Sequence, residues 1–324
     1  MNTRRTGIRH HFQKMTNSTM VTEFLLMGFV DKGEIRFLHT MLFLLMYLST
    51  LLGNLLIVSA TTLYQNLHTP MYFFLRNMSI LDMCFISVTV PNACVNSFTR
   101  NRTISLAGCA TQLFLLIYCA CVELLFLTVM AHGRSGAICQ PLLYPVIMNQ
   151  RFCVWATLFS LLSGLIYAAV HTGNTFRLSF CRSDVIYQFF CDIPPLLSNS
   201  CSDTFNSILL LIVSDIVFCG GCFFFITMSY FHIFSTVQKF PTRERGKAFS
   251  TCVPHILVVS VFLSSITYVY LKPSAASETI QDMILSSFYT IIPPLLNAMI
   301  YSFRNKQVKD AVRKVLTNFV SGKQ

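Results

Sequence analysis

Seven apolar stretches, each long enough to cross a lipid bilayer as a helix, constrain the fold of this chain more than any other feature of its sequence. About 20 helical residues span the roughly 30 Å hydrocarbon core of a membrane, and a helix satisfies its own backbone hydrogen bonds there. The sequence therefore predicts an all-α membrane protein built as a bundle of seven transmembrane helices. The predicted spans are Leu38–Leu63, Pro70–Asn96, Leu106–Gly133, Phe152–His171, Phe205–Ser235, Ala248–Leu271 and Met283–Phe303.

The composition supports a membrane protein and excludes an ordinary soluble domain. Hydrophobic residues make up 54% of the chain and charged residues only 11%, whereas charged residues reach about 25% in soluble domains. The net charge of +11 would suit a nucleic-acid-binding protein, but many basic residues lie beside the spans, where they set orientation and attract anionic lipid. We therefore expect membrane lipid as a partner and no nucleic acid.

Lysine and arginine also orient the chain in the membrane, because they concentrate next to spans on the cytoplasmic side. The inner set comprises Lys239, Arg243, Arg245, Lys247, Arg304, Lys306, Lys309, Arg313 and Lys314. We expect residues 1–37 to form an outer amino-terminal tail, residues 38–303 a membrane domain and residues 304–324 an inner carboxyl-terminal tail.

Two short segments outside the spans carry signals of their own. Asn17 opens the sequon Asn-Ser-Thr in the outer tail, so we expect it to be glycosylated. Residues 308–316, VKDAVRKVL, are apolar on one helical face and basic on the other. This pattern predicts a short amphipathic helix on the inner leaflet, with a solvated basic tail as the alternative.

Ionisable and amide side chains within the apolar stretches are candidates for function. Asp82 and Glu123 lie deep in the second and third spans, where an ionised carboxylate is costly without a partner. Two neighbouring carboxylates cannot both ionise cheaply, so either a cation neutralises them or one stays protonated. Asn54 and Asn297 are single amides on apolar helices and are expected to hydrogen-bond between helices.

Four of the 13 cysteines fall on the predicted outer side, where the environment is oxidising: Cys109, Cys181, Cys191 and Cys201. Four thiols allow three disulfide connectivities, and spacing alone does not choose among them. The chain contains no metalloprotease, phosphate-binding-loop or nucleophile-elbow motif, so we expect no enzymatic activity.

Five motifs, in order along the chain, resemble the olfactory receptors, a family of rhodopsin-like G-protein-coupled receptors. They are PMYFFL at 70–75, MAHGRSGAICQPLLYP at 130–145, Ser229-Tyr230, KAFSTCVPH at 247–255 and IYSFRN at 300–305. The resemblance covers Met15 to Leu316 and makes residues 1–14 an upstream extension. It implies a plasma-membrane receptor that binds a small volatile odorant and activates a stimulatory G protein, raising cyclic AMP.

The resemblance also implies roles for individual residues. It pairs Cys109 with Cys191 and Cys181 with Cys201, and it makes Asp82 and Glu123 a sodium site that depends on the receptor's state. Switch and coupling positions are Arg134, Tyr230, Lys247, Asn297 and Tyr301. Ligand-cavity positions are Leu116, Ile117, Ala120, Cys121, Ser214, Phe218, Ile266, Tyr270, Met283 and Thr290. Asp215 would favour a cationic or hydrogen-donating ligand if it faces the cavity.

The chain departs from the family pattern at its inner face. His132, Gly133 and Ser135 replace the acid and tyrosines expected around Arg134, and Ala298 replaces the proline expected after Asn297. Without the acid, we expect either raised basal activity or a third helix that frays at Gly133, because glycine costs about 1 kcal/mol in a helix interior. Ala298 should stiffen its helix.

These departures favour weakened coupling and leave two other functions open. One alternative is a pseudogene-like receptor that binds or signals little. A less favoured alternative is a small-solute transporter that uses Asp82 and Glu123 for a coupling ion, although the chain shows no repeated halves. A further departure, Gln188 in place of a histidine suggested to bind metal, argues against metal-assisted odorant binding.

Overall fold

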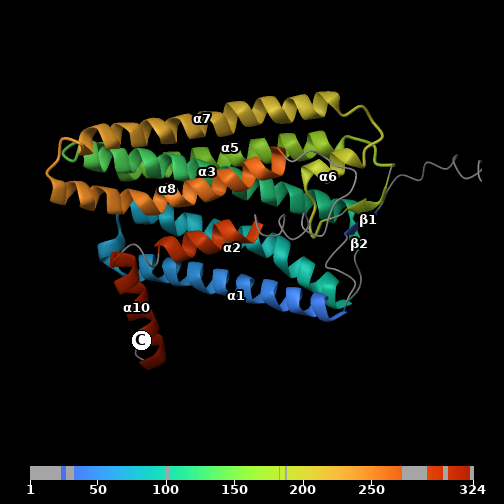
Figure 1. Ribbon diagram of the computed structural model, residues 1–324, viewed down its shortest axis with the longest axis horizontal. Coiled ribbons are helices and arrows are strands. Elements are labelled where there is room, and N and C mark those ends of the chain that lie inside the picture. Colours follow the sequence, from blue (N-terminus) through green and yellow to red (C-terminus); the bar gives the residue numbers. More distant parts are fainter. Residues whose placement is uncertain are drawn as a thin grey trace, which may run out of the picture.

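A bundle of long, roughly aligned helices forms the body of the molecule (Figure 1). The computed structural model describes residues 23–26, 33–99, 103–181, 183–186, 188–271, 290–301 and 306–321. Six helices in these ranges are long and apolar enough to cross a membrane, and Thr290–Tyr301 is a shorter apolar helix within the seventh predicted span. The long helices are α1 Gly33–Leu63, α2 Pro70–Thr99, α3 Leu106–Cys139, α5 Gln150–Phe176, α7 Phe205–Val237 and α8 Thr242–Leu271.

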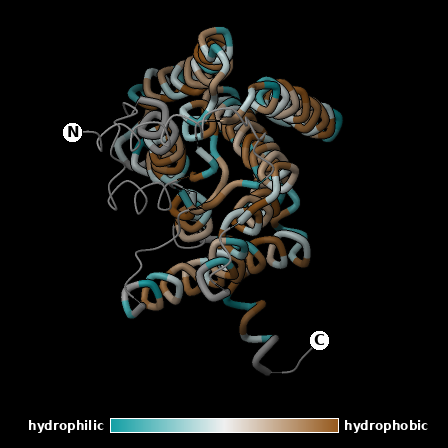
Figure 2. The backbone as a smooth tube through the Cα atoms, turned by 90° about the vertical axis from the view of Figure 1, so that its right-hand side faces the viewer, coloured by the Kyte–Doolittle hydropathy of each residue, from teal (hydrophilic) through white to brown (hydrophobic). Residues whose placement is uncertain are grey.

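Helix α3 is the centre of the bundle. It packs against α2, α5, α7 and α8, and its buried side chains include Leu113, Val122, Phe126 and Leu127. Figure 2, which looks along the bundle, shows hydrophobic residues over most of each long helix. A helix that is apolar all round suits a position surrounded by other helices or lipid, which is the position of α3.

A small sheet and two disulfides close the outer end of the bundle. Strand β1, Glu23–Leu26, pairs antiparallel with β2, Thr103–Ser105, and parallel with β3, Val185–Ile186. The disulfide Cys109–Cys191 joins α3 to the loop before the short helix α6, Ile193–Ser198, and Cys181–Cys201 joins the segment before β3 to the segment after α6. These are the two pairs that the family resemblance implies.

Short elements occupy the inner end. The turn η1, Gln65–Leu67, follows α1, and α4, Tyr144–Ile147, follows α3. The amphipathic helix expected near residue 308 is present as α10, Lys306–Ser321, and it leaves the bundle at a steep angle (Figure 1). Val308 and Ala311 on its apolar face are buried, and the Tyr72 hydroxyl donates to Gln307 Oε1 at 2.7 Å.

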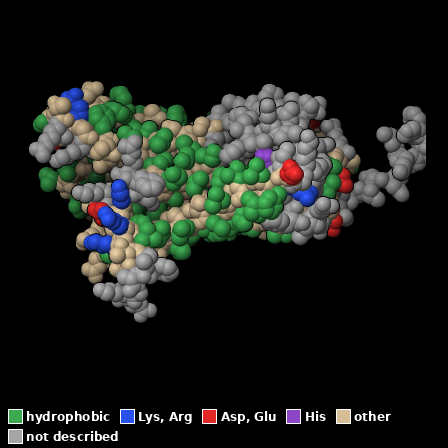
Figure 3. All heavy atoms as spheres, turned by 60° about the horizontal axis from the view of Figure 1, so that its bottom comes forward, with side chains coloured by type: hydrophobic (Ala, Val, Ile, Leu, Met, Phe, Trp, Pro, Cys, Tyr) green, Lys and Arg blue, Asp and Glu red, His purple; other side chains and the backbone are tan. Residues whose placement is uncertain are grey.

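The outer surface of the bundle matches a lipid environment. Figure 3 shows a wide apolar region along the middle of one face, with Lys and Arg toward the end near α10 and Asp and Glu toward the other. Exposed apolar side chains such as Leu45 on α1, Trp155 on α5 and Val217 on α7 contribute to such a surface. The structure therefore agrees with the predicted multi-pass architecture.

Of the two outcomes expected from the missing acid, fraying of α3 at Gly133 is wrong. The helix continues six residues further to Cys139, and Gly133 is buried beside Met148 in the turn that follows α4. A Cβ at Gly133 would lie 2.9 Å from Met148 Cε. Packing of this turn against the helix offsets the modest helical penalty of glycine.

Candidate functional site

A cavity of about 140 Å³ opens between the helices in the outer half of the bundle. Its walls come from α2, α3, α5, α7, α8, the loop before α6 and the helix Thr290–Tyr301. The lining residues are Phe85, Leu113, Leu116, Ile117, Ala120, Cys121, Glu123, Leu124, Tyr167, Phe190, Asp192, Asp215, Phe218, Cys219, Phe262, Thr290, Pro293 and Pro294. Apolar walls with few polar groups are typical of small-molecule sites.

Most of the predicted ligand residues with described side chains lie in this wall. They are Leu116, Ile117, Ala120, Cys121, Asp215, Phe218 and Thr290. The exception is Ser214, whose hydroxyl lies 3.1 Å from His171 Nε2 on α5. One residue along a helix is a rotation of about 100°, which turns Ser214 toward α5 and Asp215 into the cavity. The side chains of Ile266, Tyr270 and Met283 lie outside the described residues.

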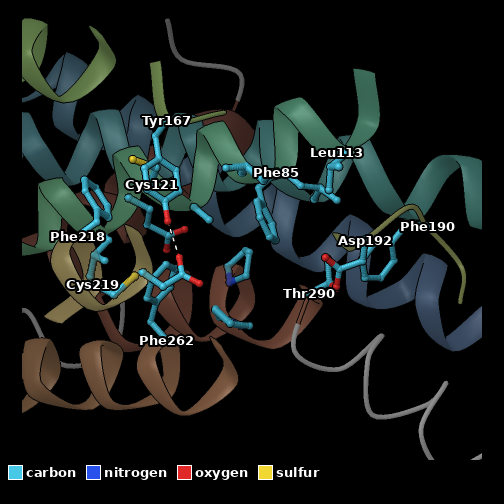
Figure 4. Close-up of a pocket in the computed structure, with 18 residues that line it drawn as sticks. Phe85, Leu113, Cys121, Tyr167, Phe190, Asp192, Phe218, Cys219, Phe262 and Thr290 are labelled. Atoms are coloured by element: carbon cyan, nitrogen blue, oxygen red, sulfur yellow. Dashed lines mark hydrogen bonds between the residues drawn. The ribbon is translucent and has the colours of Figure 1, made fainter. Parts of the chain in front are cut away.

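Asp215 lies on the inward face of α7, in helical register with the buried residues Leu211 and Cys222. The Tyr167 hydroxyl, on α5, donates a hydrogen bond to Asp215 Oδ1 (dashed line in Figure 4). The Tyr167 ring also packs against His171 and Phe218, with centroids 4.2 and 4.8 Å away. This arrangement places one carboxylate among aromatic rings in the cavity wall.

The two buried acids predicted as an ion site meet at the inner side of the cavity. Asn297 Nδ2 donates to Asp82 Oδ1 at 3.1 Å and to Glu123 Oε1 at 2.8 Å. Both carboxyl groups are almost fully buried, 1% and 2% exposed, and the described residues provide neither with a lysine or arginine partner. Asn54 Nδ2 donates to Thr50 O and, at 3.4 Å, to Pro294 O, which links α1 to the seventh helix.

At the inner end of α3, Arg134 is held by a backbone group. Its Nη1 donates to the carbonyl oxygen of Thr251 on α8, and its Nε has no hydrogen-bond partner among the described residues. Burial raises the pKa of Tyr144, in α4, so this phenol stays neutral and cannot replace the missing acid. Arg134, 7% exposed, therefore crosses from α3 to α8 through one hydrogen bond.

A second polar contact near Arg134 joins α7 to α8. The hydroxyl of Tyr230 lies 2.7 Å from His255 Nδ1, and both side chains are buried. Tyr301 is also buried, and its hydroxyl has no partner among the described residues. The Lys247 side chain and Asn17 lie outside the described residues, as do residues 1–14.

Sequence reasoning missed several residues that the structure brings into these sites. Tyr167 and His171 stand four residues apart in LIYAAVH, which puts both on one face of α5. His255 closes the KAFSTCVPH motif but was given no role in it. Gln112 donates to Val88 O at 2.9 Å and accepts from Cys191 N at 2.9 Å. For Gln112, a single amide on an apolar helix was the available signal.

Comparison with known proteins assigns this arrangement to a family. A family model described as olfactory receptor matches residues 43–319. Human olfactory receptor 14C36 is 61% identical over 303 residues, covering 93% of this chain and 97% of the relative. Human olfactory receptor 14A16 is 50% identical over 299 residues, covering 92% and 96%. The crystal structure of squid rhodopsin shares the fold, with a TM-score of 0.70 at 17% identity over 90% of this chain and 88% of that one.

Proposed function

The chain belongs to the olfactory receptor family, and on that premise we propose that it binds a small volatile odorant in the cavity and activates a stimulatory G protein to raise cyclic AMP. It is a multi-pass G-protein-coupled receptor of the plasma membrane and not an enzyme. The observation that carries the proposal is the position of α3. Its outer half lines the cavity and its inner half holds Arg134 against α8.

The mechanism is a population shift between two states. Ligand can favour an active state only if it binds that state more tightly than the inactive one. In the structure, the bond from Arg134 to Thr251 O ties α3 to α8 across the inner face. Breaking this bond would separate the two helices and leave the guanidinium free to meet the G protein. The contact between Tyr230 on α7 and His255 on α8 would change when α8 moves.

The buried acids fit a sodium ion bound in the inactive state. Asp82 and Glu123 supply hard oxygen ligands, and no described basic residue neutralises them. A bound sodium ion would supply a positive charge that keeps both carboxylates ionised. Asn297 positions the two groups relative to each other through its amide. A protonated, hydrogen-bonded pair is the alternative occupant of this space.

Membrane lipid is the proposed partner of α10. Lys309, Arg313 and Lys314 are exposed on this helix, and Lys314 Nζ also lies 5.8 Å from the Tyr64 ring centroid. Part of the apolar face is already packed against the bundle. The basic face would therefore contact anionic headgroups of the inner leaflet.

Cyclic AMP measurement in cells supplied with an olfactory-type stimulatory G protein tests this function. The full chain and Arg134→Ala are compared at equal surface level with an odorant mixture. We expect a ligand-dependent rise that is lost in Arg134→Ala and in cells without the G protein. A surface-displayed chain that never responds would contradict the proposal. If Gly133→Asp combined with Ala298→Pro then responds, the coupling-impaired alternative holds.

A further inference from the structure

The described wall of the cavity contains acids and no base. Glu123, Asp192 and Asp215 line it, and none of its described lining residues is lysine, arginine or histidine. Glu123 is bound to Asn297, and Asp192 Oδ1 accepts from the Ile193 backbone N–H at the start of α6. The remaining acid, Asp215, has a different partner.

Among the described residues, Asp215 accepts a hydrogen bond at one of its two oxygens. Tyr167 donates to Oδ1, and the described residues give Oδ2 no hydrogen bond. His171, whose ring packs on that of Tyr167, is an electrostatic neighbour of Asp215 but is not hydrogen-bonded to it and does not line the cavity. Phe218 and Cys219, one turn further along α7, and Phe262 on α8 are neighbours in the same wall, and Figure 4 shows them grouped with Tyr167 at one end of the cavity. An ionised carboxylate in such surroundings is costly unless a cation or several donors meet it.

A ligand ammonium group would complete this site. Hydrogen bonds between an ammonium and a carboxylate are about twice as strong as neutral ones, and aromatic faces attract cations within about 6 Å. The rings of Tyr167, Phe218 and Phe262 line the same cavity as Asp215. A carboxylic acid ligand would instead be repelled by Asp215, and an alcohol would leave the negative charge unmatched.

The size of the cavity limits the rest of the ligand. A dry cavity of about 150 Å³ holds one benzene molecule, which is close to the 140 Å³ found here. Leu116, Ile117 and Leu124 provide an aliphatic wall for a ring or short chain.

We propose that this receptor selects small apolar amines, with the ammonium group bound to Asp215 and the hydrocarbon part packed against α3 and α8. The proposal rests on the proposed function, because it takes the cavity to be the ligand site. It deepens that function by naming the chemical class of the odorant.

Binding to the purified full chain in lipid nanodiscs tests the proposal without requiring signalling. The probes are cyclohexylamine, cyclohexanol and cyclohexanecarboxylate, which share a ring and differ in charge. A hydrogen bond to a charged group contributes about 1.5–3 kcal/mol, so we expect cyclohexylamine to bind at least about tenfold more tightly than cyclohexanol, and the carboxylate not to bind. Asp215→Asn should remove the amine preference and keep cyclohexanol binding, whereas Asp215→Glu should retain the preference.

The matched control is Asp203→Asn, which makes the same change at an exposed acid outside the cavity wall. The proposal is overturned by equal or better binding of the alcohol or the carboxylate, by absence of amine binding, or by an amine preference that survives Asp215→Asn. A cyclic AMP measurement distinguishes failure of the amine proposal from failure of the proposed signalling function. Amine binding without a cyclic AMP rise contradicts only the coupling, and a response to other odorants without amine preference contradicts only the ligand class.

Discussion

The two ends of α3 are fixed in different ways. At the outer end, Cys109 is bonded covalently to Cys191, and Gln112 adds two hydrogen bonds, to Val88 O and from Cys191 N. At the inner end, Arg134 donates to the carbonyl oxygen of Thr251 on α8, and its Nε has no partner among the described residues. Ser135 Oγ also lies 3.3 Å from His232 Nδ1 on α7. The same helix is therefore braced where it lines the cavity and held weakly where it meets α8.

A receptor must keep the shape of its ligand cavity and must be able to open the contact between α3 and α8, and the two ends of α3 differ in this sense. A disulfide contributes about 2–5 kcal/mol to stability, while one hydrogen bond to a charged group contributes about 1.5–3 kcal/mol. The cavity can thus keep its shape while the inner contact opens. The departures from the family pattern at His132, Gly133 and Ser135 lie at the inner end of α3, and the cavity lies toward its outer end.

Removing the outer brace should have the largest effect. Cys191→Ser breaks the bond to α3, and loss of a native disulfide costs about 2–5 kcal/mol, so we expect surface display to fall close to background. Flow cytometry with an amino-terminal epitope measures this. Cys84→Ser, at an exposed free cysteine, is the control and should display normally. Unchanged display of Cys191→Ser would show that the outer end does not depend on its covalent link.

The next effect concerns the middle of α3, where α5 crosses it closely. A Cβ on Gly164 would lie 2.5 Å from Val122 Cγ2 and 3.2 Å from Tyr118 Cδ2. Gly164→Ala should therefore overpack the contact and cost about 1–3 kcal/mol, seen as a lower melting temperature of the purified receptor. Gly173→Ala on the same helix, with nothing within 4 Å, should change little. Val122→Ala should restore stability in the Gly164→Ala background, and failure to do so would place the strain elsewhere.

The smallest effect is expected at the inner end. Gly133→Asp supplies the missing acid next to Arg134, and the atom closest to an added Cβ there is the flexible end of Met148, at 2.9 Å. A weak ion pair of up to about 1 kcal/mol should lower basal cyclic AMP about two- to fivefold. Asparagine has nearly the same size as aspartate but no charge, so Gly133→Asn should have higher basal activity than Gly133→Asp. Equal effects of the two variants would mean that volume, and not charge, governs this position.

The sequence predicted the bundle well because apolar runs and flanking charges determine where a chain can cross a membrane. Prediction from the sequence failed for features that depend on packing between segments far apart in the chain. Strand β1 pairs with β2 near residue 104 and with β3 near residue 185. No local pattern in Glu23–Leu26 indicates those partners. Likewise, the propensity of Gly133 predicted fraying, whereas Met148 packs against it and the helix continues.

The candidate site was predicted fully on α3 and with one exception on α7. Positions on α3 such as Leu116 and Ala120, which the family resemblance implies, lie in the wall together. On α7, a rotation of one residue separates Ser214, which faces His171, from Asp215, which faces the cavity. Tyr167 was not foreseen because its importance depends on the distance between α5 and α7, which the sequence does not give.

The pairing of β1 has a practical consequence for protein engineering. Because β1 lies between β2 and β3, a truncation or a replacement leader that removes Glu23–Leu26 would leave two unpaired strands at the outer end. A fusion tag joined upstream of Glu23 preserves the sheet. Translation from either Met1 or Met15 retains this strand, so expression vectors built on the two initiators would produce receptors with the same outer sheet.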